Sequence, residues 1–300
     1  MRPVLRPSDL LTLFFLVLLS CLAVFSAPVN PSWTGLFATY AALAVAILAA
    51  AVYRTKVDPA KKGFYLSVVA TVVTVLFMFN SLGALIASIH TTIFDACLIA
   101  VDHAIFGVHP TVWMERLISP ALSAILQFAY ISYYFIPLLL CIVLIASGKF
   151  GEFEEALFGI LLCFYLSYVC YLLVPAIGPR FTLSQLQTVG LQVPPFIEKI
   201  QNALNVLEKT KTDAFPSGHT AISLMSLYYA WKEREKKIFL GLIPVVTGLI
   251  ISTVYLRYHY VIDVIAGIAL TGLTIALAPG LRRLISATLG YPGDKRHRSS

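Results

Sequence analysis

The chain has 300 residues, of which 59% are apolar and only 12% are charged, and its mean hydropathy is +0.84. A water-soluble domain carries about 25% charged residues, so this composition excludes an aqueous globular protein and predicts an all-α, integral membrane helical bundle. The net charge of +7 is spread over short loops between apolar runs, which is typical of membrane proteins and gives no indication of nucleic-acid binding.

Eight apolar runs follow one another along the chain, and a bilayer core needs roughly 20 apolar residues per helix. We therefore predict about eight transmembrane helices. The sixth run is short and can cross only if it begins inside the bundle, where protein covers the backbone. We expect the first run to be retained rather than cleaved as a signal peptide, because Pro28 would follow the cleavage site. The predicted spans are residues 9–27, 34–53, 64–89, 121–147, 154–176, 217–231, 238–256 and 259–279.

Eight alternating spans divide the loops between two sides of the membrane. The side that holds both termini collects 16 of the 22 lysine and arginine residues. The positive-inside rule then predicts that both termini are cytoplasmic and that the opposite side is extracytoplasmic. The minority side holds Arg116, Arg180, Lys199, Lys209, Lys211 and Arg257.

Two segments on the minority side are expected to be short amphipathic helices. Residues 195–208 begin with Pro195, which suits a first helical position, and place most of their apolar side chains on one face. The stretch 94–106 is similar. Such helices either lie flat among the lipid headgroups or pack as a lid on the bundle, and the pattern leaves both interpretations open.

The last span opens with His259 and Asp263, which share one helix face because they are four residues apart. A carboxylate there can accept a hydrogen bond from one ring nitrogen, which fixes the tautomer and leaves the other nitrogen free and more basic. This arrangement is typical of an oriented nucleophile or base. A buried pair that only stabilises the helix start is the alternative.

Two further groups of polar residues belong to the same side of the membrane. The sixth span opens with the run 214–220, Ala-Phe-Pro-Ser-Gly-His-Thr, and free N–H groups at a helix start bind anions such as phosphate. His219 would then stand beside the anion as a donor. Arg180 follows the fifth span and offers a planar fork for phosphate oxygens. Each group alone has a structural explanation, but their joint occurrence indicates phosphoryl chemistry.

These residues resemble the type 2 phosphatidic acid phosphatase superfamily. The matching motifs are Gly178-Pro179-Arg180, Pro216-Ser217-Gly218-His219 and the segment from Arg257 to Asp263. The resemblance covers roughly residues 64–279 and implies a six-helix catalytic core. Residues 1–63 would then add two N-terminal helices, and residues 280–300 would form a basic cytoplasmic tail.

The resemblance implies a metal-independent reaction that passes through a phosphohistidine, with no cofactor. His259 would attack phosphorus, Asp263 would orient it, and His219 would protonate the departing oxygen. Such transfer is catalysed mainly by positioning and by positive charge around the phosphoryl oxygens. The residues implied to hold those oxygens are Arg180, Ser217 and the N–H of Gly218.

The chain departs from the family pattern at two cationic positions. The phosphatase branch has a lysine seven residues before the motif arginine, where this chain has Leu173, and an arginine six residues before the nucleophilic histidine, where it has Thr253. Arg257 is expected to replace this charge as a further phosphate-binding residue. Lys209 or Lys211 could also contribute, although both suit a solvated loop equally well.

The run from Val254 to Tyr260 is similar to the branch that includes inositol phosphorylceramide and sphingomyelin synthases. We therefore expect a phosphatase of a lipid phosphate or diphosphate, and keep as the alternative a phosphotransferase that moves a phosphorylated headgroup onto a lipid alcohol. A lipid-binding or transporter bundle without catalysis and a serine hydrolase that uses Ser217 are weaker hypotheses. In the segment 95–109 the acidic residues and histidines fit no metal motif, and we expect them to be structural or solvated.

Overall fold

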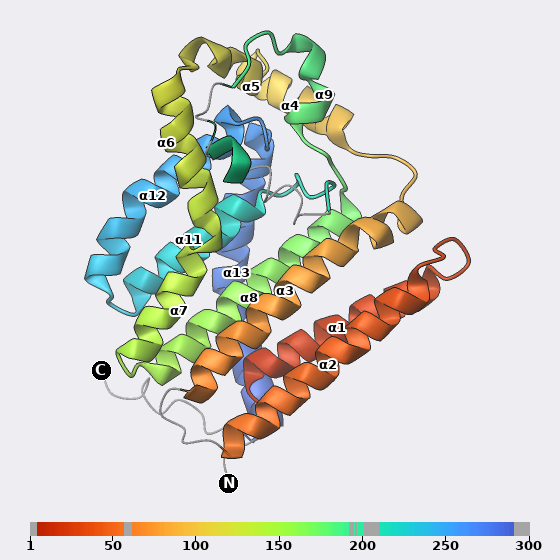
Figure 1. Ribbon diagram of the computed structural model, residues 1–300, viewed down its shortest axis with the longest axis vertical. Coiled ribbons are helices and arrows are strands. Elements are labelled where there is room, and N and C mark those ends of the chain that lie inside the picture. The colour runs from red at the N-terminus through yellow and green to blue at the C-terminus, as the bar shows by residue number, and fades with distance from the viewer. Residues whose placement is uncertain (1–4, 57–61, 192–194, 196, 201–209, 291–300) are drawn as a thin grey trace.

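The computed structural model describes residues 5–56, 62–191, 195, 197–200 and 210–290. Within these ranges the regular elements are all helical, apart from one isolated parallel bridge between Ala176 and Asp213. The elements (Figure 1) are α1 (Pro7–Phe25), α2 (Trp33–Lys56), α3 (Lys62–Ile89), α4 (Asp95–Phe106), α5 (Pro110–Trp113), η1 (Met114–Leu117), α6 (Pro120–Ile131), η2 (Ser132–Tyr134), α7 (Ile136–Ala146), α8 (Phe150–Leu173), α9 (Pro179–Thr182), η3 (Ser184–Leu186), α11 (Gly218–Lys232), α12 (Lys236–Tyr255) and α13 (Val261–Thr288).

The prediction of an all-α membrane bundle is confirmed. Six of the described helices, α1, α2, α3, α8, α12 and α13, are long and apolar enough to cross a membrane, and two bent helix pairs raise this number to up to eight. Helix α8 is the central one. In its most apolar 18-residue stretch 72% is buried inside the protein, compared with 28–44% in the corresponding stretches of the other five helices. Helices α1, α3 and α13 pack directly against α8, and all six long helices contribute side chains to one apolar core.

The fourth predicted span, 121–147, is broken rather than straight. Helices α6 and α7 are bent by 51° at the short 3-10 turn η2. Pro137 stands in the first turn of α7, where its missing N–H and the clash of its ring with the carbonyl four residues earlier favour a bend in the helix. This break turns Tyr130 and Tyr133 toward the start of α11, as their contacts with His219 show.

The sixth span, α11, has 15 residues, as short as the sequence predicted, and is buried over most of its length. The last span differs in length from the prediction. The last predicted span ends at residue 279, but α13 continues through Pro279 to Thr288, because one proline removes a single backbone hydrogen bond and the next turns can resume.

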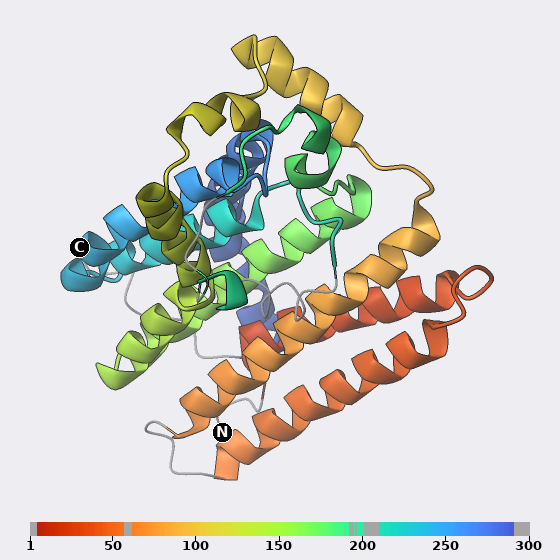
Figure 2. The same cartoon turned by 45° about the horizontal axis from the view of Figure 1, so that its top comes forward.

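The two N-terminal helices form an antiparallel pair along one side of the bundle (Figures 1 and 2). Phe15 of α1 stacks on Tyr165 of α8 with ring centroids 4.6 Å apart. The hydroxyl groups of Thr12 and Tyr165 share a hydrogen bond of 2.8 Å, and Arg6 pairs with Glu154 at 3.0 Å. Helix α1 is therefore joined to the central helix by aromatic, polar and ionic contacts.

The short elements α4, α5 and α9 gather at one end of the bundle, where α8 ends and α13 begins (Figure 1). Helix α4 lies across this end and buries Leu98, Asp95 and Asp102, so the lid interpretation of the segment 94–106 agrees with its packing. Most of the other predicted amphipathic segment, 195–208, lies outside the described residues.

Candidate active site

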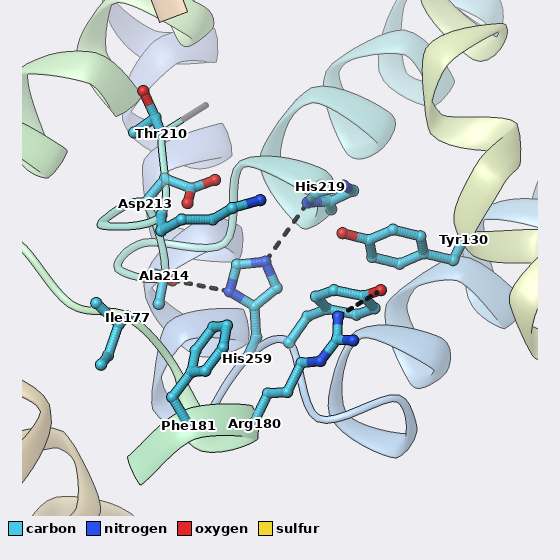
Figure 3. Close-up of a pocket in the computed structure, with 11 residues that line it drawn as sticks. Tyr130, Ile177, Arg180, Phe181, Thr210, Asp213, Ala214, His219 and His259 are labelled. Carbon is cyan, nitrogen blue, oxygen red and sulfur yellow. Dashed lines mark hydrogen bonds between the residues drawn. The ribbon is translucent and has the colours of Figure 1, made fainter. Parts of the chain in front are cut away.

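A pocket opens at the end of the bundle that α4 covers. Its walls come from α6, from the segment 177–181, from the segment 210–214, from the start of α11 and from the turn between α12 and α13. The two histidines at its base are nearly buried, with His259 4% and His219 9% exposed, while Arg180 is exposed at its rim. Residues as far apart in sequence as Tyr130 and His259, which are 129 positions apart, therefore converge on one cavity (Figure 3).

His259 is held in one orientation by its Nδ1 atom. Nδ1 lies 2.8 Å from the carbonyl oxygen of Ala214, and a carbonyl can only accept a hydrogen bond, so Nδ1 carries the proton. In the neutral ring the other nitrogen, Nε2, then carries no proton and has a lone pair available for bonding. It faces His219, whose Nδ1 lies 3.4 Å away (Figure 3).

Asp263 stands behind His259 at the same nitrogen. Its Oδ2 lies 3.5 Å from His259 Nδ1 and accepts a 2.8 Å hydrogen bond from the N–H of Tyr260. The sequence pattern suggested the carboxylate as the acceptor that fixes the tautomer, but the closer acceptor is the Ala214 carbonyl. Asp263, which is fully buried, contributes mainly a negative charge beside the imidazole ring.

His219 belongs to a column of aromatic rings. Its ring centroid lies 4.5 Å from that of Tyr130 and 4.2 Å from that of Tyr133. Tyr130 in turn stacks on Tyr258 with centroids 4.4 Å apart. We call the rings of Tyr133, His219, Tyr130 and Tyr258 the aromatic column, and it fixes the ring plane of His219 beside His259.

Arg180 extends the aromatic column by a cation–π contact. Its guanidinium carbon lies 5.5 Å from the Tyr258 ring centroid, and its Nη1 donates a 3.4 Å hydrogen bond to the Tyr258 hydroxyl (Figure 3). The chain reaches Arg180 through Gly178, which has φ +86° and whose Cβ would lie 2.5 Å from the Tyr258 carbonyl oxygen. Only glycine permits this close approach.

Two buried carboxylates of α4 hold the segments that carry the site. Asp95 accepts hydrogen bonds from the N–H groups of Ile177 and Gly178, at 2.9 and 2.8 Å. Asp102 accepts from Val261 and Ile262, at 2.9 and 2.8 Å. The first pair of bonds fixes the segment before Arg180, and the second caps α13 just after His259, so both carboxylates are structural, as expected.

Ser217 and Gly218 do not line the pocket. The Ser217 hydroxyl caps its own helix by accepting from the Thr220 N–H at 3.3 Å. A Cβ at Gly218 would lie 2.3 Å from the Tyr171 hydroxyl, so a larger residue here would displace the Tyr171 side chain. Gly218 and His219 lie in the first turn of α11, where backbone N–H groups have no intrahelical acceptor. The positive end of the helix dipole therefore lies beside His219 at the base of the pocket.

The structure places Arg257 outside the pocket, which corrects its expected role in phosphate binding. Its Nη2 lies 2.9 Å from Glu115 Oε1 and also donates to the Val189 carbonyl, while Nη1 donates to Gln187 at 3.3 Å. The guanidinium group is thus engaged with η1 and the segment 187–189. A buried ion pair of this kind is costly to break, so Arg257 anchors the outer loops instead.

The pocket also contains two tyrosines and a carboxyl group that the sequence motifs did not indicate. It is lined by Tyr130, Tyr258 and Asp213, together with Lys211, which the sequence had left open as either a phosphate contact or a solvated loop residue. Aromatic residues are common in membrane bundles, so the two tyrosines gave no signal of their own. Asp213 lies a few residues before His219 in the sequence, and that proximity was the signal that could have identified it.

Among the described residues no group of three or more histidine, cysteine, aspartate or glutamate side chains is arranged to hold a metal ion. Nε2 of His259, the His219 ring and the Arg180 guanidinium instead converge on the pocket from different elements. An unprotonated ring nitrogen beside a cation and a second histidine is suited to nucleophilic attack on an anionic centre.

Comparison with known proteins gives one match. A family model described as the PAP2 superfamily matches residues 96–277, which is more than half of the chain and includes every residue of the pocket. No curated protein and no solved structure matches the chain.

Proposed function

The chain belongs to the PAP2 superfamily, and on that premise we propose that it is a metal-independent phosphatase of lipid phosphates or lipid diphosphates. Family membership and the long apolar helices support a phosphatase-type enzyme that acts on lipids. The observation that carries the proposal further is the orientation of His259, whose Nδ1 is held by the Ala214 carbonyl while Nε2 faces the pocket.

In the first step, the lone pair of His259 Nε2 attacks phosphorus, and the bond from phosphorus to the lipid oxygen breaks. His219 enters this step protonated and gives its proton to that departing oxygen, so a lipid phosphate leaves as the alcohol and a lipid diphosphate leaves as the lipid monophosphate. The imidazole ring gains positive charge as the N–P bond forms, and the buried carboxylate of Asp263, 3.5 Å from Nδ1, stabilises it. Arg180 holds phosphoryl oxygens from the rim of the pocket.

In the second step, a water molecule attacks the phosphohistidine and passes its proton to His219. The N–P bond breaks, and inorganic phosphate leaves with His259 restored. If a lipid alcohol took the place of water, the same residues would carry out a phosphotransferase reaction, and the run from Val254 to Tyr260 favours this alternative. Arg257 gives it no support, because its side chain is engaged outside the pocket.

We also propose that the pocket faces the extracytoplasmic side and that both termini are cytoplasmic. Residues 64–279 would form the catalytic bundle, with α1 and α2 as an addition at its side. The charge distribution of the loops supports the orientation, and the position of α1 and α2 along one side of the bundle supports the division (Figure 1).

The decisive experiment measures turnover of the purified full-length protein in detergent with a metal chelator present. The substrates are phosphatidic acid, a polyprenyl diphosphate, and phosphatidylinositol together with a lipid alcohol. We expect phosphate release from one of the first two, unchanged by the chelator. A new headgroup-bearing lipid in the third mixture, without phosphate release, would establish the phosphotransferase instead, and activity that disappears with the chelator would contradict the metal-independent reaction.

Three variants connect turnover to the site. His259→Ala should lower turnover by more than about 1,000-fold because the nucleophile is lost. Asp263→Asn should lower it by roughly 100- to 1,000-fold, because the charge is lost while the Ala214 carbonyl still fixes the tautomer. The matched control is His103→Ala, an exposed histidine outside the pocket, which should keep wild-type turnover. Full activity of His259→Ala would contradict a phosphohistidine.

A further inference from the structure

The segment 210–214 is fixed at both of its ends. The Thr210 hydroxyl donates to the Phe79 carbonyl at 2.6 Å and accepts from the Gly83 N–H at 3.2 Å, which ties it to α3. At the other end, the N–H of Ala214 donates to the Ala176 carbonyl at 3.0 Å. Lys211 therefore stands between two anchored residues and extends from a defined position.

The same pairing sets this segment beside the one that carries Arg180. Ala176 and Asp213 form a parallel bridge, and the chain continues from Ala176 through Gly178 to Arg180. The Ala214 carbonyl also accepts the hydrogen bond of His259 Nδ1. One short stretch of backbone thus connects the positions of Lys211, Arg180 and the buried histidine.

Lys211 and Arg180 are the lysine and arginine residues that line the pocket within the described part of the chain. Both are exposed, whereas the two histidines lie buried, so the cations stand at the rim above the reactive nitrogen. Asp213 brings a carboxyl group to the same walls. A phosphate group carries up to about two negative charges, so a second cation beside Arg180 would favour its binding.

We propose that Lys211 is the second phosphate-binding cation of the pocket, which contacts phosphoryl oxygens together with Arg180. The inference rests on the proposed function and adds to it a substrate contact from the segment 210–214. It also explains how the site functions although Arg257 is held by Glu115. An ammonium group on a flexible stem can follow the phosphoryl oxygens as their charge is redistributed between the two steps.

The test measures phosphate binding directly and does not depend on turnover. The melting temperature of the full-length protein in detergent is recorded as inorganic phosphate is added, with sodium chloride at equal ionic strength as the reference. Lys211→Met should weaken the apparent affinity for phosphate by roughly 10- to 100-fold, as expected for the loss of one charge-assisted hydrogen bond. Lys211→Arg should restore most of it. The matched control is Lys199→Met, an exposed lysine outside the pocket, which should bind phosphate like the wild type.

The outcomes separate this inference from the proposed function. Equal phosphate affinity in Lys211→Met and the wild type would overturn the inference, even if His259→Ala abolishes turnover. Loss of affinity in Lys211→Met, with rescue by arginine and an unchanged melting temperature without phosphate, would support it even if none of the tested lipids is hydrolysed. Equal weakening in Lys199→Met would also overturn it, because the effect would then be one of general surface charge.

Discussion

Tyr130 contacts two other members of the aromatic column and so connects the two functional ends of the pocket. Its ring stacks on His219 at 4.5 Å and on Tyr258 at 4.4 Å, and Tyr258 carries the Arg180 contact. Stacked aromatic pairs contribute about 0.5–1.5 kcal/mol each beyond the area they bury. Tyr130 is only 3% exposed, so its ring is a fixed spacer between the proposed acid and the proposed phosphate-binding arginine.

We expect Tyr130→Leu to lower turnover by roughly 10- to 100-fold, since the loss of two stacked pairs releases His219 and Tyr258 from their relative positions. Tyr130→Phe keeps the ring and should retain most of the activity. Steady-state kinetics of the two variants tests this. Tyr255→Leu is the control for a buried tyrosine lost outside the pocket. If Tyr130→Phe is as impaired as Tyr130→Leu, the hydroxyl group rather than stacking is responsible.

At the scale of elements, α4 supports the site without contributing to the walls of the pocket. Its two buried carboxylates bind the backbone of the segment before Arg180 and the first turn of α13. The first N–H groups of a helix have no intrahelical acceptor, and here Asp102 of another helix supplies one. The position of His259 therefore depends on a helix that is remote from it in sequence.

Replacement of Asp102 should show this dependence. Asp102→Ala should lower the stability of the fold by about 1–2 kcal/mol, as for the loss of a helix cap, and should lower turnover although no substrate contact is removed. Asp102→Asn keeps one acceptor oxygen, so its stability and turnover should lie between those of the wild type and those of Asp102→Ala. Thermal unfolding in detergent and steady-state kinetics measure both effects. Cys97→Ala, a change at an exposed position of the same helix, should alter neither, and a fully stable Asp102→Ala would show that the cap is dispensable.

The whole molecule has two chemically different ends. At the end opposite the pocket, ion pairs join neighbouring helices, among them Arg6 with Glu154, Lys149 with Glu235 and Lys232 with Glu155. The pocket end instead carries the short elements α4, α5 and α9 (Figure 1). This polarity agrees with the uneven distribution of lysine and arginine between the two sets of loops, and it supports the proposed cytoplasmic position of the ion-paired end.

Labelling of single cysteines tests this orientation. In a cysteine-free background, Gly190→Cys lies in open space near the pocket end, and Lys237→Cys is exposed at the ion-paired end. A membrane-impermeant maleimide should label position 190 in intact cells and position 237 only after lysis. The reverse pattern would place the pocket in the cytoplasm and contradict the positive-inside assignment.

The sequence alone predicted the fold class, and its local motifs indicated residues that lie together in the candidate site. Apolar runs of membrane length indicate an all-helical bundle, because the bilayer core offers no water to the backbone N–H and C=O groups and a helix pairs these groups within one segment. His259, His219 and Arg180 were identified from local motifs, and the structure brings them together. Arg257 was assigned to the pocket because it lies two residues from His259, whereas its side chain turns toward Glu115. Proximity in sequence does not determine the direction of a side chain in a turn.

Composition and spacing therefore determined that the chain belongs in a membrane and that its fold is helical, and the motifs indicated the candidate site, since each of these depends on properties that are local in the chain. Tertiary packing decided the rest. It made the Ala214 carbonyl the partner of His259, built the aromatic column around His219 and carried Lys211 to the pocket. These contacts join segments that are remote in sequence, and only the mutual packing of helices fixes the distances between them.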